Sequence, residues 1–237
     1  GIKVVSRFSQ ADMLAGGCGA PLTAVYHAFL GANLEKPVCF LDIGGISSLT
    51  WVGDNGEMLA FDIGPGLVPV NDWVLKHGGM QMDYNGSLAV TGQVDTRILS
   101  TLMKHKFLAL YPPKAADRDT FKEKCEHLEG LSLSDGAATS TAFIAEAVAY
   151  SLAIYVPEMP KKMVVCGIGA QNPTLLRFLR QRLQGMDVIN SAEEGWKPEA
   201  VEAQAYAFIA ARRVYNLPIS YPLTTGVPEP MVCGEIF

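Results

Sequence analysis

Hydrophobic and polar positions along this chain predict strands and helices in alternation. Mostly apolar runs of strand length cover residues 38 to 43, 48 to 53, 58 to 63, 163 to 166 and 186 to 190. Asp54-Asn55-Gly56 joins the second run to the third, and Asn-Gly supplies the positive φ values of a tight hairpin turn. The first three runs are therefore expected to form an antiparallel meander. Gly1 to Ser6 is expected to form one more short strand.

Apolar residues recur with helical spacing in the segments between these runs. Helices are expected over residues 23 to 31, 70 to 79, 95 to 105, 135 to 155, 173 to 183 and 198 to 215. Asp95 is a suitable N-cap, Ser134 or Asp135 is expected to cap the long apolar helix, and Pro173 suits a first helical position. The order of elements predicts an α/β domain with a mixed sheet. The long helix serves either the core or an interface.

Composition narrows the class of protein. The chain has 237 residues, of which 49% are hydrophobic, enough for a sizeable core. Its net charge is −5 and it has no Lys/Arg cluster, which argues against nucleic acid and anionic membranes as partners. No apolar run reaches the roughly 18 to 20 residues of a membrane span. The first residues contain no signal-peptide core, so a cytoplasmic location is expected.

Cysteine and histidine positions do not indicate a metal site. The five cysteines are widely spaced without a CxxC pair, and the four histidines are scattered. Cys39 and Cys166 lie in strand-like runs and are expected to be buried, reduced thiols. No residue is assigned as a metal ligand.

Glycines after two predicted strands are the main candidates for ligand binding. Gly44-Gly45 end the first run of the meander, and Ser47 follows among other hydroxyl residues. Backbone N–H groups without a Cβ beside them can surround a phosphate, although the same residues suit a plain hairpin. Gly167 and Gly169 lie between a strand and a helix, where a nucleotide or only a structural turn is expected, because the third glycine of GxGxxG is missing.

Two further residues have candidate chemistry. Asp12 precedes the glycine-rich segment AGGCGAPL, where a carboxylate within hydrogen-bond reach can accept a proton from water or a hydroxyl. A capping or turn role is the alternative for Asp12. His27 lies in a predicted helix and is first interpreted as a packed residue.

Several colinear stretches resemble the bacterial anhydro-N-acetylmuramic acid kinases. They are ADMLAGGCGAPL, DIGGISSLT, FDIGPG, NDWVLKHGG, DYNGSLAVTGQVD, YPPKAADRDTF, CGIGAQNPTL and EAQAYAFIAARRVYNLPISYPLTTGVPEPM. The resemblance implies a ribonuclease-H-like lobe of the actin-like and sugar-kinase superfamily, with ATP and Mg²⁺ bound between lobes. It also implies cleavage of the 1,6-anhydro ring by water and phosphorylation of the 6-hydroxyl, giving N-acetylmuramic acid 6-phosphate in peptidoglycan recycling.

The same resemblance assigns roles to residues of this chain. Asp12 matches the catalytic base. Contacts to the amino sugar, 1,6-anhydro-N-acetylmuramic acid, are expected from Gly17, Gly19 and His27. Contacts to the nucleotide are expected from Gly44, Gly45, Ser47, Gly64, Gly66, Gly167, Gly169 and Asn172. A homodimer is a further expectation.

The chain also departs from the family pattern. The family's first phosphate loop is absent, so residues 1–36 are expected to be the remnant of an N-terminal lobe and 37–237 the C-terminal nucleotide-binding lobe. Arg7-Phe8-Ser9 stands where the family has Asp-Phe-Arg, Cys18 replaces a Gln, and the ligand-facing corners contain Ile63, Leu67 and Ile168. The alternative is therefore a catalytically inactive, truncated relative that keeps the fold and retains nucleotide binding or dimerisation.

Overall fold

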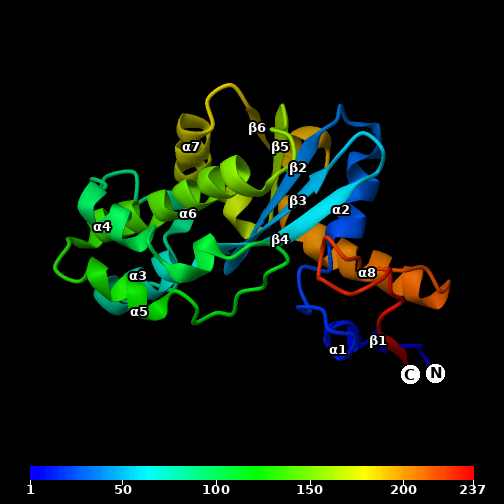
Figure 1. The fold of residues 1–237 in the computed structure, drawn as a ribbon. Coiled ribbons are helices and arrows are strands. Elements are labelled where there is room, and N and C mark those ends of the chain that lie inside the picture. The colour runs from blue at the N-terminus through cyan, green and yellow to red at the C-terminus, as the bar shows by residue number, and fades with distance from the viewer.

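A five-stranded mixed sheet, with strand order β4-β3-β2-β5-β6, forms the centre of the computed structural model, which describes residues 1–237 (Figure 1). Its strands are β2 (Val38–Ile43), β3 (Ile46–Val52), β4 (Met58–Pro65), β5 (Lys162–Cys166) and β6 (Asp187–Asn190). β2, β3 and β4 are antiparallel neighbours, whereas β5 runs parallel to both β2 and β6. The predicted meander and mixed sheet are confirmed.

Helices cover both faces of this sheet. The α-helices are α1 (Phe8–Leu14), α2 (Ala24–Leu30), α3 (Val68–Gly78), α4 (Thr96–Leu102), α5 (Lys122–Cys125), α6 (Leu133–Tyr155), α7 (Pro173–Arg182) and α8 (Val201–Val214). The 3₁₀ helices are η1 (Gly31–Asn33), η2 (Tyr84–Gly86), η3 (Lys106–Ala109), η4 (Glu126–Leu128), η5 (Ile168–Gln171), η6 (Ser191–Glu194) and η7 (Pro198–Ala200). Figure 1 shows α3, α4, α6 and α7 on one side of the sheet and α2 and α8 on the other.

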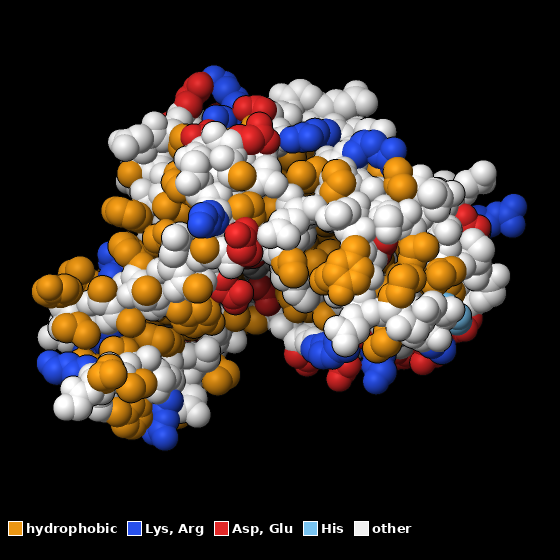
Figure 2. Space-filling view, turned by 180° about the vertical axis from the view of Figure 1, so that it is seen from behind, with side chains coloured by type: hydrophobic (Ala, Val, Ile, Leu, Met, Phe, Trp, Pro, Cys, Tyr) orange, Lys and Arg blue, Asp and Glu red, His pale blue; other side chains and the backbone are white.

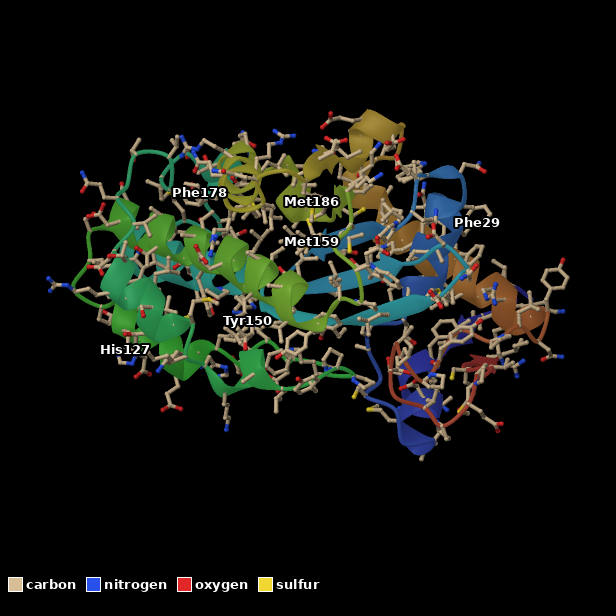
Figure 3. All side chains as sticks on the ribbon, turned by 45° about the horizontal axis from the view of Figure 1, so that its top comes forward. Phe29, His127, Tyr150, Met159, Phe178 and Met186 are labelled. Atoms are coloured by element: carbon tan, nitrogen blue, oxygen red, sulfur yellow. The ribbon has the colours of Figure 1, made fainter.

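Alternation along β2 divides its side chains between two cores, since successive residues of a strand point to opposite faces. Cys39 and Leu41 belong to the larger core under α6, while Val38 and Phe40 belong to the smaller core under α2 and α8. Figure 3 shows the same division, with Tyr150 extending from α6 and Phe29 from α2. Both faces of the sheet are therefore covered.

The long apolar helix α6 is the central helix of the larger core. Its 23 residues pass a length and hydropathy test for a membrane span, so the expectation that no stretch does so is wrong. However, 72% of the qualifying window is buried inside the fold. Of the two alternatives for this helix, the structure shows the core role, and most of its side chains face protein neighbours.

The two ends of the chain form a separate two-stranded sheet. β1 (Val5–Ser6) pairs antiparallel with β7 (Glu235–Ile236). Residues of α1 and α2 pack there with the C-terminal tail in a small third core that contains Phe8, Val25 and Ile219. Segments far apart in the sequence thus enclose the loop that follows α1, as the blue and red ribbons of Figure 1 show.

Side-chain caps mark the starts of α4, α6 and α7, and two predicted boundaries are corrected by the structure. Asp95 accepts hydrogen bonds from the N–H groups of Arg97 and Ile98, as predicted. The cap of α6 is Ser132, which accepts from the Asp135 N–H, and neither Ser134 nor Asp135 occupies the cap position. The first strand is also shorter than predicted, because only Val5 and Ser6 pair with β7. An α-helix begins soon after it, at Phe8.

All five cysteines are free thiols. Cys39, Cys166 and Cys233 are buried, Cys125 is partly buried and Cys18 is exposed. The predicted state of Cys39 and Cys166 is confirmed. Burial raises the pKa of the Cys166 thiol, so it stays protonated near neutral pH.

Candidate functional site

A cleft of about 320 Å³ lies between the C-terminal end of β2 and the loop after α1. Its lining comprises Ser9, Gly19, Ala20, Pro21, Leu22, Thr23, Asp42, Gly44, Gly45, Ile46, Ser48, Asp62, Glu202 and Tyr206. Three of these residues are carboxylates and none is Lys, Arg or His. Figure 2 shows acidic side chains gathered in a hollow near the middle of one face of the molecule.

Three polar residues of the cleft form one row across the sheet. Asp42 of β2 is paired with Ser48 of β3, and Ser48 is paired with Asp62 of β4. Directly paired residues have their side chains on the same face of a sheet, so the row points toward the cleft on the side covered by α2 and α8. The apolar strands thus end in a row of oxygen-bearing side chains.

Asp42 is the carboxylate at the meeting point of the two glycine corners. Burial, assisted by the negative charge of Glu202, raises its pKa from 3.8 to about 6. No group of the protein donates a hydrogen bond to it, and Gly167 lies so close that a Cβ atom there would overlap Oδ1 of Asp42. An unpartnered carboxylate in this position favours a cation or a donor from a ligand.

Asp62 is held by the loop that follows η3. Its Oδ2 accepts a hydrogen bond of 2.8 Å from the Ala116 N–H. Burial raises the pKa of Asp62 to about 6, against the lowering effects of this bond and of Lys114. The ammonium of Lys114 donates to the carbonyls of Phe107 and Leu108, both at 3.2 Å, which fixes the loop beside β4.

This raised pKa predicts a pH dependence of stability. The folded protein binds a proton at Asp62 more tightly than the unfolded chain, so Asp62 favours folding below pH 3.8 and loses this contribution as pH rises through about 6. Asp62→Asn keeps an oxygen for the Ala116 N–H and removes the charge. We expect the variant to melt at a higher temperature than the parent at pH 8, with a smaller difference at pH 5.

Thermal melts of both proteins from pH 5 to pH 8 measure this effect. Asp54→Asn is the matched control, because Asp54 lies exposed in the hairpin turn. A parent and an Asp62→Asn variant whose melting temperatures differ by the same amount at every pH would show that Asp62 does not titrate as described.

The first glycine corner follows β2 directly. The N–H groups of Leu67 and Val68, which precede and begin α3, donate to the carbonyls of Gly44 and Gly45 at 2.9 and 3.2 Å. Gly66 makes this approach possible, because a Cβ atom there would lie 2.5 Å from the Gly44 oxygen and 2.7 Å from the Gly45 oxygen. Gly45 itself is exposed, and the nearest atom to a Cβ at Gly44 would be 3.8 Å away. Hydrogen bonds from the start of α3 therefore hold the corner on one side, and its other side is open toward the cleft.

The second corner, Gly167 to Gly169, packs against the end of the same strand. A Cβ atom at Gly169 would be 2.5 Å from Cγ2 of Ile43. A neighbouring pocket of about 230 Å³ is lined by residues of α3 and η5, including Asn71, Ile168 and Asn172. Asn172 also caps α7 by accepting from the Leu175 N–H at 3.0 Å. The carboxyl ends of the parallel strands β2 and β5 are where α/β sheets bind ligands.

Asp12 lies on the other side of the cleft, in α1, and is fully buried. Its Oδ1 accepts from the Gly19 N–H at 2.7 Å, and its Oδ2 accepts from the Thr225 hydroxyl at 2.6 Å. Gly17 lies directly over the carboxylate, where a side chain would overlap Oδ1. Asp12 therefore orders the loop between α1 and α2 and ties it to the C-terminal segment.

Residues 1–237 match the family model of the anhydro-N-acetylmuramic acid kinases. The chain belongs to this kinase family. It is 43% identical over 238 residues to the anhydro-N-acetylmuramic acid kinase of Paramagnetospirillum magneticum, covering 99% of this chain and 66% of the relative. It is also 44% identical over 239 residues to that of Methylorubrum populi, covering 100% of this chain and 62% of the relative. The chain thus spans slightly less than two thirds of the length of these kinases.

A solved structure with a similar fold is the activator of the 2-hydroxyisocaproyl-CoA dehydratase from Clostridium difficile with bound ADPNP. The TM-score is 0.51 at 19% identity, over 82% of this chain and 68% of that chain. This similarity concerns the fold alone. Together with the strand order of the central sheet, it confirms the ribonuclease-H-like, actin-like lobe that the resemblance to the kinase family implies.

Of the residues expected at the site by resemblance to the kinase family, only Gly19, Gly44 and Gly45 line the cleft, and Asn172 lines the neighbouring pocket. Three of the others are directed at protein neighbours. Ser47 is fully buried and donates its hydroxyl to the Pro65 carbonyl at 2.8 Å. Gly64 faces the ring of Phe121 instead, since a Cβ atom at Gly64 would lie 2.8 Å from that ring. His27 is a buried residue of α2 that forms a 2.9 Å hydrogen bond with the Thr50 hydroxyl, and burial lowers its pKa to about 4.

Sequence reasoning missed the acidic residues of the cleft and Thr225. Asp42 carried the clearest signal, because a carboxylate is unusual at the end of an otherwise apolar strand. Glu202 looked like any charged residue near a helix start. Thr225 lies 213 residues from Asp12, so only the fold shows that the two side chains meet.

Proposed function

We propose that this chain supplies the nucleotide-binding lobe of an ATP-dependent kinase acting on 1,6-anhydro-N-acetylmuramic acid. The observation that carries the proposal is the meeting of both glycine corners and Asp42 at the carboxyl end of β2, across a cleft from the loop that Asp12 orders. The proposed sugar substrate is the one that the names of the related kinases give. The reaction opens the 1,6-anhydro ring with water and transfers the γ-phosphoryl group of ATP to the 6-hydroxyl.

The residues present fit a magnesium nucleotide. Asp42 is an unpartnered carboxylate that would hold Mg²⁺, and oxygen ligands of this kind suit that ion. Gly44 and Gly45 would approach the phosphates, while Ile168 and Asn172 would contact the nucleoside in the adjacent pocket. Phosphate next to carboxylates requires a cation between them, and Mg²⁺ supplies that charge neutralisation during phosphoryl transfer.

The protein residues would act by positioning and by accepting a proton. Asp12 would take the proton from the attacking water, and its hydrogen bonds from Gly19 and Thr225 fix the direction of both carboxylate oxygens. The braced Gly44-Gly45 corner would keep the phosphates in place without reorganising during the reaction. Most of the rate enhancement would come from such preorganised groups.

A second candidate function is binding without turnover. The observation that favours it is the complete burial of Asp12, whose two oxygens already have partners within the chain. A relative that binds nucleotide but does not phosphorylate would keep the glycine corners and Asp42. The boundary between lobes at residues 36 and 37, the cytoplasmic location and the homodimer likewise stay predictions.

Calorimetric titration of the purified chain with Mg-ATP and then with 1,6-anhydro-N-acetylmuramic acid tests the proposal, alongside an assay of ADP release. Binding of both ligands with sugar-dependent ADP release is the expected result for the kinase. Nucleotide binding without ADP release would favour the second candidate. No binding of Mg-ATP would overturn both.

Gly44→Ala tests the phosphate corner separately. The new methyl group would find open space within the protein, because the nearest atom is 3.8 Å away. It would occupy the space through which a phosphate approaches the backbone. We expect the melting temperature to stay within about 2 °C of the parent, corresponding to less than about 1 kcal/mol, and the affinity for Mg-ATP to fall about tenfold.

The matched control is Gly16→Ala, in the loop between α1 and α2. A Cβ atom there also meets nothing within 4 Å, although φ is +93° and the variant is strained. It should lower the melting temperature somewhat and leave the nucleotide affinity unchanged. Equal Mg-ATP affinity of Gly44→Ala and the parent would remove Gly44 from the site.

A further inference from the structure

A second pocket, of about 200 Å³, lies on the opposite side of the Gly44-Gly45 corner from the cleft. α3 forms one wall, and the segment from Arg118 to Glu129, which contains α5 and η4, forms the other. In Figure 1 these elements lie together at the end of the molecule away from the chain termini, and Figure 3 labels His127 on this segment. The pocket and the cleft have only Ile46 in common.

The floor of this pocket is aromatic and apolar. Trp73 is 5% exposed, Phe121 2% and Leu128 1%. The Trp73 ring is fixed in place, because its Nε1–H donates to the Leu133 carbonyl at 2.9 Å and its face packs on His77. An apolar cavity of about 150 Å³ is already large enough to hold benzene. A single aromatic ring therefore fits this space.

The rim carries equal numbers of positive and negative groups. Arg118 pairs with Asp72 at 2.7 Å, and Lys76 pairs with Glu129 at 2.6 Å. The remaining two charged residues of the rim, Lys122 and Glu126, have no ion-pair partner and oppose each other in sign. A ligand with net charge would meet as many like charges as unlike ones, so the rim favours an occupant without net charge.

The geometry points to a binding site for a small aromatic molecule of no net charge. The ring would lie against Trp73 and Phe121, where burial of apolar surface supplies the affinity. Polar substituents would remain at the rim with Lys122 and Glu126. None of the residues assigned to the nucleotide or the sugar is needed for this binding.

Occupation of this pocket would act on the phosphate corner through α3. Val68 lines the pocket, its N–H donates to the Gly45 carbonyl at 3.2 Å, and its Cγ2 lies 3.1 Å from where a Cβ of Gly45 would be. A ligand that moves the start of α3 therefore moves Gly45. This consequence rests on the proposed nucleotide site, whereas binding in the pocket does not.

Three probes with the same ring and different charge test the site: benzyl alcohol, benzylammonium and phenylacetate. NMR titration follows the indole N–H signals of the chain, in which Trp51 and Trp196 are internal controls outside the pocket. We expect benzyl alcohol to shift the Trp73 signal at the lowest concentration, with each charged probe at least about threefold weaker. Absence of a Trp73 shift, or equal binding of all three probes, would overturn the site.

The variant Lys122→Glu provides a more discriminating test, because it gives the rim a net negative charge and leaves the buried floor of the pocket unchanged. The affinity of this variant for benzylammonium, relative to its affinity for phenylacetate, should be about fivefold higher than in the parent. Lys124→Glu is the control, being the same change two residues away at a position outside the lining. Equal effects of both variants would contradict the assignment. A chain that binds benzyl alcohol at Trp73 but does not bind Mg-ATP would overturn the proposed function and leave this site standing.

Discussion

Asp12→Asn should lower turnover by about 10²- to 10⁴-fold, the usual contribution of a positioned general base. The amide has nearly the same shape as the carboxylate, so its oxygen can still accept from the Gly19 N–H, and the Thr225 hydroxyl can rotate to accept from its NH₂ group. What it cannot do is take a proton from water. The affinity for Mg-ATP should stay within a few-fold of the parent, because Asp12 would act on the proton and does not line the nucleotide corner.

Steady-state ADP release and calorimetry, measured on the same preparation, separate these two effects. Asp54→Asn again provides a control of identical chemistry at an exposed turn. Equal turnover of Asp12→Asn and the parent would leave Asp12 with only the structural role its hydrogen bonds show. Loss of nucleotide affinity together with turnover would indicate that the loop has collapsed into the cleft.

Gly66→Ala should strongly destabilise the fold beside the site. The new Cβ atom would lie 2.5 and 2.7 Å from the carbonyl oxygens of Gly44 and Gly45. These are backbone atoms, already bonded to the N–H groups of Leu67 and Val68, and they cannot move aside as a side chain can. We expect a loss of about 3 kcal/mol, at the upper end for an overpacked site.

Such a loss corresponds to a fall in Tm of about 6 to 12 °C for a domain of this size. Differential scanning calorimetry measures it, and Gly44→Ala is the comparison on the same corner with open space around its methyl group. A Gly66→Ala variant with the same melting temperature as the parent would show that the residue after β4 does not approach the corner as closely as described.

The elements that could be predicted from the sequence are those whose boundaries are determined locally. Apolar runs located β2 and β5, Asn55-Gly56 located the hairpin, and Asp95 located the start of α4. α1 was missed for a local reason as well. It is short, it has no side-chain cap, and glycines follow it, so the pattern favoured a loop.

The candidate site divides in the same way. Gly44 and Gly167 could be found because each follows an apolar strand, which is a local feature. The burial of Asp42, the absence of any partner for it and the bond between Asp12 and Thr225 depend on contacts between distant segments. The resemblance to the kinase family predicted ligand contacts for Ser47 and His27. Hydroxyl and imidazole groups, however, form hydrogen bonds with buried protein neighbours as readily as with ligands.

The parallel pairing of β2 with β5 has a consequence for the order of folding. The β2-β3-β4 meander joins strands that are close in sequence. Val38 of β2, in contrast, pairs with Lys162 of β5, and α3, α4 and α6 lie between these two residues in the sequence. Contacts of such large sequence separation form slowly, because a long loop must close before they stabilise anything. In refolding, the meander should therefore acquire hydrogen-exchange protection before β5 does. Gly44 and Gly167 come together only in that last step, so a newly made chain becomes competent to hold a ligand at the end of folding.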